Sequence, residues 1–456
     1  MADEPVNFFD LHPGAPAAGE PPSATSEADY GENVVSLPPR KRGHAGWKKE
    51  WHASEAGTPL PNLFNVMIAL RNHPKIMGVV WFDDMGCVPI VRGSNGWRLL
   101  TDADVLAIQE ELQRTGLRRV SKSVVQDGIT YHASQNRYHP VREYLAALKW
   151  DGETRIRGWL SRYLGVEGCK YADEIGRLFM IALVARVMQP GCKADYMLIL
   201  EGPQGALKSS ACRVLAGEWF SDNLPDLGRG DAVRLSMHLR GKWLLEIGEL
   251  SSFNAAESHT LKEFLTQTVE RYTPKYARQE VCEPRQCLFI GSTNEDVYMR
   301  DATGARRFWP VKVGEINLDA LTVDRDQLLA EAFTAFQGGA SWWPDREFEA
   351  EHIAPQQEAR YEVDPWEEHV ATWLAGGLRY DNEGLPELDL AGTHLYRKPV
   401  GSTTPKEILL CCLGMRPGQV TVRDTRRVGA ILKRLGWKRN EKDSRKRFER
   451  KEENPY

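Results

Sequence analysis

Three short apolar runs stand in the middle of the chain, and each ends in small or polar residues. They read YMLILEG at 196–202, KWLLEIGEL at 242–250 and QCLFIGSTN at 286–294. Unbroken apolar runs of this length are typical of parallel strands that helices cover on both faces. A buried-helix pattern, ADEIGRLFMIALVARVM at 172–188, precedes them. We therefore predict an α/β fold whose ligand lies beyond the carboxyl ends of the strands.

The region before this sheet has a mixed pattern. LPNLFNVMIALRNHP at 60–74 and TDADVLAIQEELQRTG at 101–116 space their apolar residues like helices, and the second has a capping start and a glycine stop. MGVVWFDDMGCVPIV at 77–91 predicts two strands around a turn. We also expect strand character around Asp127-Gly128 and a helix after Pro140. These elements predict a small α+β domain.

The C-terminal region combines two helical patterns with a basic hairpin. STTPKEILLCCLG at 402–414 and TRRVGAILKRLG at 425–436 predict the helices, and WKRNEKDSRKRFERK at 437–451 predicts two strands with a turn at 441–444. This order is typical of a winged-helix-like domain. The predicted parts are an acidic, Pro-rich disordered tail (1–45), an α+β domain (46–152), the parallel-sheet domain (153–330), a helical linker (331–365) and the basic winged-helix-like domain (366–456).

The composition mainly excludes some classes of protein and of site. A chain of 456 residues has room for two or three domains, and 42% hydrophobic residues with a net charge of -4 indicate a soluble globular protein. There is no apolar run of about 18 residues, so we expect no membrane span. The eight cysteines form no CxxC pair and have no zinc-finger spacing. Reduced thiols in a cytoplasmic protein are the simplest interpretation.

The first apolar run leads into GPQGALKSS at 202–210, which resembles a phosphate-binding loop. In such a loop, backbone N–H groups point at the phosphates. Lys208 would reach the β- and γ-phosphates, and Ser209 would coordinate Mg²⁺. Leu207 stands where the pattern has its second glycine, so its side chain must point away from the nucleotide. The residues predicted to bind ATP are Gly202, Gly205, Lys208, Ser209 and Ser210.

The other two apolar runs supply polar groups at the same predicted edge of the sheet. Glu246 and Glu249 end the second run, and Asn294 ends the third. We predict that Glu249 polarises the attacking water and that Glu246 supports the Mg²⁺ shell, although the two roles can be exchanged. Asn294 would hold the γ-phosphate or the water. Two exposed glutamates at a strand end are the simpler alternative.

Two arginines follow in TGARRFWPV at 303–311. Arg306 or Arg307 would neutralise charge on the transferring phosphoryl group, as an arginine finger does. The alternative is a pair of surface arginines. The lysine loop, the acidic strand end, the asparagine and the arginines come in order within one predicted sheet, so each supports the others.

The stretch from about Gly191 to Gly314 resembles the virulence-associated protein E family of phage, prophage and genomic-island proteins. These proteins are similar to superfamily 3 helicases within the AAA+ class. The resemblance rests on long phrases in order, among them GCKADYMLILEGPQG, HLRGKWLLEIGEL and TGARRFWPV. NRYHPVREYLAALKWDGETRI at 136–156 extends it upstream, so that it covers roughly 130–315.

This resemblance implies a Mg²⁺-dependent ATPase that works on DNA as a homo-oligomeric, hexameric ring. It implies a helicase or translocase in replication of a phage or mobile element, in the cytoplasm of a bacterial or phage-infected cell. ATP would lie between subunits, with Arg306 or Arg307 acting in trans. No primase signature is present, so a priming or other replication partner would be a separate chain. Leu207 and Gly248, where AAA+ proteins often carry Asp, depart from the pattern.

The segment VERYTPKYARQEVCEPRQ at 269–286 lies where related helicases have a hairpin that points into the ring channel. Cations there would follow the phosphates of DNA, and an aromatic ring would stack on a base. The basic C-terminal helix provides a second candidate surface. The predicted DNA-binding residues are Lys275, Tyr276, Arg278, Arg426, Arg427 and Lys433.

Two other functions remain open from the sequence. One is an ATP-assembled DNA-binding initiator or replisome-remodelling module with little unwinding activity, which the basic C-terminus and Leu207 favour. The other is a small-molecule kinase built on the same loop, for which the sequence offers no acceptor pocket or lid.

Overall fold

The computed structural model describes two compact units, Met1–Arg360 and Tyr361–Tyr456. The predicted disordered tail (1–45) lies outside the described residues. The described residues are 46–93, 96–224, 232–250, 255–274, 279–299, 305–361, 364–378, 396–397, 399–440, 443 and 447–450.

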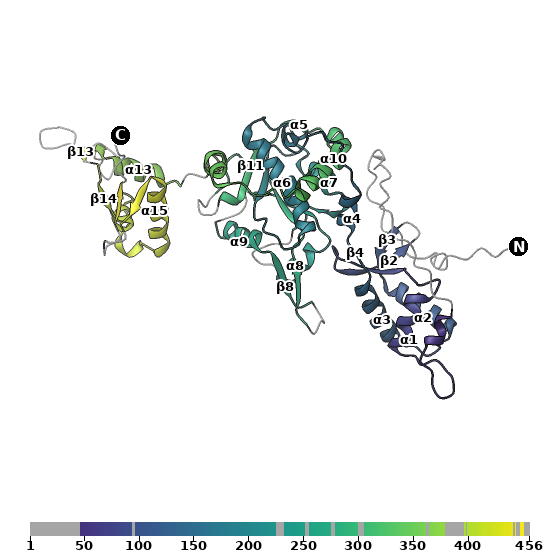
Figure 1. The fold of residues 1–456 in the computed structure, drawn as a ribbon. Coiled ribbons are helices and arrows are strands. Elements are labelled where there is room, and N and C mark those ends of the chain that lie inside the picture. Colours follow the sequence, from purple (N-terminus) through teal and green to yellow (C-terminus); the bar gives the residue numbers. More distant parts are fainter. Residues whose placement is uncertain are drawn as a thin grey trace. The chain divides into compact units, whose positions relative to one another are not determined.

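A five-stranded, all-parallel sheet forms the centre of the first unit (Figure 1). Its spatial order is β11-β5-β10-β7-β6, so the three predicted runs are neighbours in the middle of the sheet. The prediction of a parallel α/β sheet is confirmed. The strands are β5 (Met197–Glu201), β6 (Phe220–Ser221), β7 (Leu244–Ile247), β10 (Leu288–Thr293) and β11 (Phe308–Lys312).

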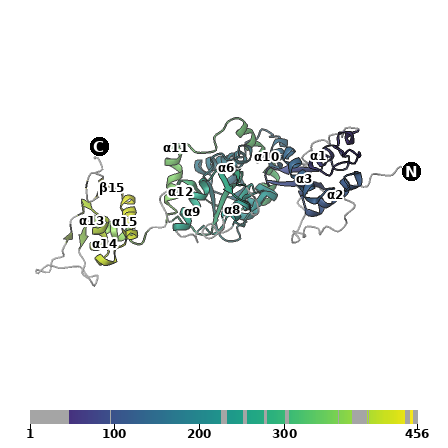
Figure 2. The same cartoon turned by 90° about the horizontal axis from the view of Figure 1, so that it is seen from below.

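Helices cover both faces of this sheet, and the alternation of side chains along the strands decides which core each residue joins. Leu198 and Leu200 of β5 pack with α6 (Lys170–Met188), α7 (Lys208–Ala216) and α10 (Leu318–Gln337). Met197 and Ile199 of the same strand pack with the other core, to which α8 (Ala232–Leu239) and α9 (Ala255–Thr266) contribute. The two views show these helices around the strands (Figures 1 and 2).

The first unit begins with a small α+β region. Its sheet has the order β3-β2-β1-β4, and the strands are β1 (Val80–Asp83), β2 (Val88–Gly93), β3 (Gly96–Leu99) and β4 (Arg137–Tyr138). Its helices are η2 (Trp47–Glu50), α1 (Leu63–Asn72), α2 (Asp102–Thr115) and α3 (Lys122–Gln135). Thr101 and Asp104 form a capping box at the start of α2, and Gly116 ends the helix, as the pattern predicts.

The expected strand at Asp127-Gly128 is wrong, because α3 covers both residues. Gly128 serves close helix packing instead of a turn. A Cβ atom at this position would lie 2.6 Å from Cγ1 of Val66 on α1. Ser121 caps the start of α3 by accepting a hydrogen bond from the backbone of Val124.

The elements between 139 and 360 complete the first unit. The helix predicted after Pro140 is present, and α10 crosses the predicted domain boundary at 330/331. Gln357 Nε2 donates to the backbone oxygen of Phe308 at 2.8 Å, so the expected linker packs on the sheet domain. These elements are α4 (Pro140–Ala147), α5 (Trp159–Leu164), η3 (Gly217–Trp219), β8 (Val269–Tyr272), β9 (Val281–Pro284), η5 (Ala305–Arg307), α11 (Arg346–Phe348), the π-helix η6 (Glu349–Ile353) and α12 (Ala354–Glu358).

The second unit has its own small core, which includes Val370, Ile408, Leu432 and Phe448. Two helices and an antiparallel hairpin occur where the sequence predicts them, although most of the expected turn at 441–444 lies outside the described residues. The elements are α13 (Glu367–Ala375), β12 (Gly377–Leu378), β13 (Tyr396–Arg397), β14 (Ser402–Thr403), α14 (Pro405–Cys411), η7 (Pro417–Gln419), α15 (Val422–Arg434), β15 (Trp437–Arg439) and β16 (Phe448–Arg450). Among the described residues, no helix is both long and apolar enough to cross a bilayer.

Candidate nucleotide-binding site

The loop between β5 and α7 has the backbone of a phosphate-binding turn. Gly202 N–H donates to the backbone oxygen of Thr293 at 3.1 Å, which ties the start of the loop to β10. Gly205 has φ 83°, and Leu207 has φ 60° and ψ 20°. Leu207 therefore adopts the left-handed conformation that glycine takes without steric cost. Its side chain is 47% exposed, so it lies away from the interior of the protein.

Lys208 is the first residue of α7, and its ammonium group lies inside the loop. Nζ donates to the backbone oxygens of Gly202 at 2.6 Å and Pro203 at 3.0 Å, and to Oδ1 of Asn294 at 3.1 Å. Burial lowers the pKa of Lys208, and the negative charge of Glu246 opposes this shift. The lysine thus connects the phosphate loop with the asparagine at the end of β10.

Glu246 on β7 is the candidate cation ligand beside the loop. Ser209 Oγ donates to Glu246 Oε1 at 2.9 Å, while Oε2 is buried without a hydrogen-bond partner. A buried carboxylate oxygen without a partner is costly. Mg²⁺ binds through one or two protein oxygens and fills its octahedron with water and phosphate oxygens. Ser209 and Glu246 therefore fit the ion, and the described residues form no larger cluster of His, Cys, Asp and Glu.

Glu249 stands just beyond the end of β7 with φ 53°, a conformation that is uncommon for a residue with a side chain. It is exposed at the carboxyl edge of the sheet, as is Asn294 after β10. Non-glycine residues held in this region concentrate at functional sites, because the surrounding structure must offset the strain. The structure thus brings Lys208, Glu246 and Asn294 to one edge of three adjacent strands, with Glu249 beside them.

The arginine pair lies at the opposite edge. β11 runs parallel to β5 with Phe308 opposite Met197, so Arg306 and Arg307 precede the strand at its amino end. The five residues of β11 span about 16 Å, which separates both arginines from the phosphate loop of their own chain. Arg306 is exposed, while Arg307 Nε lies 3.9 Å from Oδ2 of Asp195.

The candidate DNA contacts are only partly described. Lys275, Tyr276 and Arg278 lie outside the described residues, although the stems β8 and β9 that flank them pair antiparallel. Arg426 and Lys433 are exposed on α15.

Arg427 is already engaged within the second unit. It donates to both carboxylate oxygens of Asp364, at 2.7 and 2.8 Å, and its guanidinium lies 3.7 Å from the ring centre of Trp366. Sequence reasoning did not detect these contacts, and they make Arg427 a weaker candidate than Arg426 for binding DNA.

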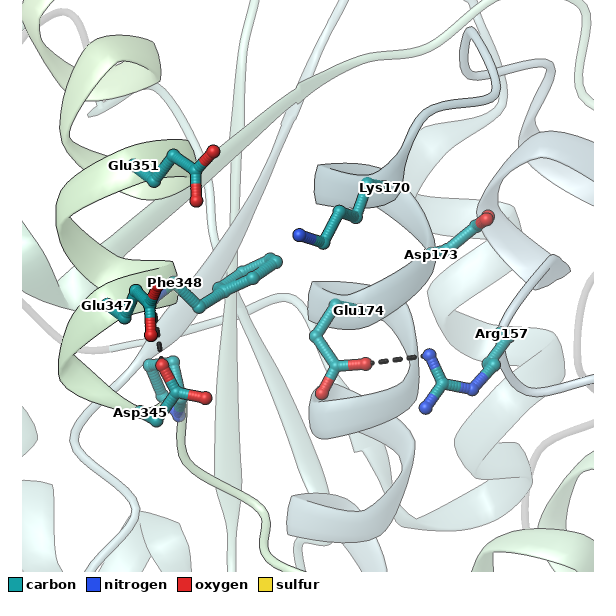
Figure 3. A pocket seen from close by; sticks show the side chains of 9 residues that line it. Arg157, Lys170, Asp173, Glu174, Asp345, Glu347, Phe348 and Glu351 are labelled. Atoms are coloured by element: carbon teal, nitrogen blue, oxygen red, sulfur yellow. Dashed lines mark hydrogen bonds and ion pairs between the residues drawn. The ribbon is translucent and has the colours of Figure 1, made fainter.

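A separate pocket of about 610 Å³ lies between the start of α6 and the α11 region (Figure 3). Glu174 points to Arg157 on the α6 side of the pocket, with an ion pair of 2.9 Å. Acidic side chains outnumber basic ones in its lining, so it does not suit a polyphosphate. The lining residues are Arg157, Lys170, Asp173, Glu174, Pro344, Asp345, Glu347, Phe348 and Glu351.

Comparisons with known proteins find a domain model that matches the region of the site. Three apo structures of the NrS-1 C-terminal region are similar to this chain, with 17%, 16% and 17% identity and TM-scores of 0.38, 0.36 and 0.39. The first two alignments cover 65% of this chain and 74% of that one, and the third covers 69% and 78%. No curated protein sequence matches. The virulence-associated protein E-like domain model matches residues 145–362, which include the sheet, the phosphate loop and the arginine pair. The chain therefore contains a virulence-associated protein E-like domain.

Proposed function

We propose that the protein is a Mg²⁺-dependent ATPase that moves along or melts DNA during replication of a phage or mobile element. The observation that supports this proposal best is the joint contact of Lys208 with the phosphate loop and with Asn294. This contact brings a cation and an amide together at the carboxyl ends of two adjacent parallel strands, where ligands of such sheets bind.

Each residue has a defined task in this proposal. Lys208 exchanges its loop carbonyls for β- and γ-phosphate oxygens when ATP binds. Ser209 and Glu246 would hold Mg²⁺, whose positive charge would offset the negative charge of the phosphates. Asn294 reads the γ-phosphate. Glu249 orients the attacking water from its exposed position beyond β7.

The placement of the arginines supports assembly into a ring. An arginine at the amino edge cannot reach its own nucleotide, but a neighbouring subunit can present it to the phosphate loop of the next chain. The exposure of Arg306 and the contact of Arg307 with Asp195 make Arg306 the better arginine finger. A head-to-tail contact of this kind closes into a ring when the rotation between neighbouring subunits returns to the first one. The β8–β9 hairpin and α15 would provide the surfaces for DNA.

ATP hydrolysis with and without single-stranded DNA tests the function. We expect DNA-stimulated turnover in the wild type and none in Lys208→Ala, because the phosphates lose their principal cation. Lys170→Ala removes an exposed lysine at the start of α6 and serves as the charge-matched control. Equal turnover in Lys208→Ala and the control would refute the site.

The exposed cationic face of α15 supports a second candidate, an initiator that uses ATP only to assemble on duplex DNA. Arg423, Arg426 and Lys433 are exposed at helical spacing on this face. ATP-dependent oligomers on duplex DNA without strand separation would favour this function over a helicase.

A further inference from the structure

A buried carboxylate ends the strand that leads into the phosphate loop. Glu201 is the last residue of β5 and only 1% exposed. Arg360 donates two hydrogen bonds to its carboxylate, from Nε to Oε1 at 2.8 Å and from Nη2 to Oε2 at 2.9 Å. Tyr298 Oη donates to Oε1 at 2.9 Å. Glu201, Tyr298 and Arg360, here called the Glu201 cluster, come from three separate segments of the first unit.

The backbone strengthens the same connection. The N–H groups of Tyr298 and Met299 both donate to the carbonyl oxygen of Arg360, at 3.1 and 3.0 Å. Tyr298 lies four residues after Asn294, within the segment that follows β10. The Asn294 segment is therefore tied to Arg360 by two backbone bonds and, through Glu201, by side chains.

The charges in the cluster are matched. Both oxygens of the buried Glu201 carboxylate accept hydrogen bonds, so no oxygen is left unsatisfied. Burial, together with the negative charge of Glu201, raises the pKa of Tyr298, so its hydroxyl stays a donor. Loss of one partner would leave a buried charge incompletely paired, which is strongly unfavourable.

Arg360 is also the last residue of the first unit. Tyr361, the next residue, belongs to the second unit, where the guanidinium of Arg434 lies 3.7 Å from its ring centre. Arg434 in turn contacts Glu367 at 3.0 Å. Adjacent residues thus anchor the chain in each unit, and one peptide bond joins the two anchors.

We infer that Glu201, Tyr298 and Arg360 are positioning residues that hold Asn294 in register with the γ-phosphate and transmit its position to the second unit. The inference rests on the proposed ATPase function. None of the three side chains needs to touch the nucleotide, since they act through the segment that carries Asn294.

Steady-state kinetics of the full chain tests the positioning role. Tyr298→Phe removes only the hydroxyl that binds Glu201. Because Asn294 would be less well oriented in the transition state, we expect kcat to fall about tenfold, with KM for ATP within about twofold of wild type. Tyr163→Phe is the matched control, since this buried tyrosine also donates to a carboxylate, that of Asp324 at 2.7 Å on α10. Equal kinetics in the two variants would overturn the role.

Hydrogen exchange tests the transmission without any need for turnover. Arg360→Lys keeps the positive charge and the backbone carbonyl but loses the bidentate hydrogen bonding to Glu201. In the wild type we expect a non-hydrolysable ATP analogue and ADP to give different exchange at the amides of 298–299 and at α13. In Arg360→Lys the difference at α13 should disappear while analogue affinity stays within about threefold.

Calorimetric titration of the same samples separates the possible failures. If the wild type binds neither nucleotide, the proposed function fails first and the inference falls with it. If it binds both but α13 exchanges identically in the two states, or if Arg360→Lys keeps the difference, the ATPase proposal stands and the coupling is refuted.

Discussion

Leu207 explains how an imperfect motif can still form the loop. The sequence pattern asks for glycine because the backbone must turn into the left-handed region, and Leu207 takes that conformation despite its Cβ atom. Its exposed side chain lies away from the interior of the protein. The motif therefore encodes a backbone shape, and side-chain identity at 207 affects mainly the energy of reaching it.

Replacing Leu207 tests this interpretation. Leu207→Gly removes a strain of about 1 kcal/mol but gives the unfolded chain a comparable gain in entropy. We expect a nearly unchanged melting temperature and turnover within about threefold of wild type, less than 1 kcal/mol in the barrier. Leu207→Ile puts a β-branched residue at positive φ and should destabilise the fold by about 1 kcal/mol or more. A large gain in turnover for glycine would show instead that Leu207 limits hydrolysis.

His139 gives a pH-dependent prediction at the same scale. Its Nδ1 accepts the backbone N–H of Arg142 at the start of α4, and Nε2 lies 2.7 Å from Oε1 of Gln286. Gln286 Nε2 donates to the backbone oxygen of Asp84, so the chain of bonds reaches the N-terminal sheet. Protonation of Nδ1 would break the first bond. Burial lowers the pKa of His139 to about 4.

The folded pKa lies below the unfolded value, so the unfolded chain binds more protons between about pH 6.5 and about pH 4. Stability is therefore present above this window and is lost as pH falls through it, by up to about 3 kcal/mol for this residue. In urea unfolding at pH 7 and pH 4.5, His139→Asn should keep a capping oxygen and show a smaller loss. An unchanged loss would assign the effect to other groups, such as His132, whose pKa is also lowered to about 4.

At the scale of elements, the local sequence pattern predicts most helices and strands, but it does not predict contacts between residues that are distant in the sequence. The buried strands β5, β7 and β10 were readable because apolar runs this short fit little else, and α2 because both of its ends carry capping signals. Helix α3 was missed because Gly128 serves packing against Val66, which no local pattern reveals. The Glu201 cluster was equally hidden, since Arg360 is 159 residues from Glu201.

The exposed face of α15 supports a prediction about DNA binding. Arg426→Ala should lower the slope of log affinity against log salt by about 1, because one phosphate contact is lost. Lys406→Ala removes an exposed cation from α14 and is the control. Fluorescence anisotropy between 50 and 200 mM salt measures the slope, a range over which such contacts respond strongly. Equal changes in both variants would mean that net charge alone, and not this face, determines binding.

At the scale of the whole molecule, the sheet separates the two groups of residues that the proposed ATPase would combine. The phosphate loop is at the carboxyl edge and Arg306 at the amino edge, and parallel pairing of β5 with β11 fixes this separation. The order of motifs along the sequence does not reveal this separation. Arg306 precedes its strand, whereas the phosphate loop, Glu249 and Asn294 follow theirs. In the proposed ATPase, a complete centre would therefore require a second copy of the chain.

Mixing two inactive variants tests this requirement. Lys208→Ala keeps its arginine and Arg306→Ala keeps its phosphate loop, so a random mixture should restore about a quarter of wild-type turnover at head-to-tail interfaces. Lys208→Ala mixed with Asn294→Ala is the control, because both residues must come from one chain and no complete centre can form. ATPase assays before and after subunit exchange measure the recovery. If the first mixture stays as inactive as the control, Arg306 does not complete a neighbour's site, and its position no longer supports a ring.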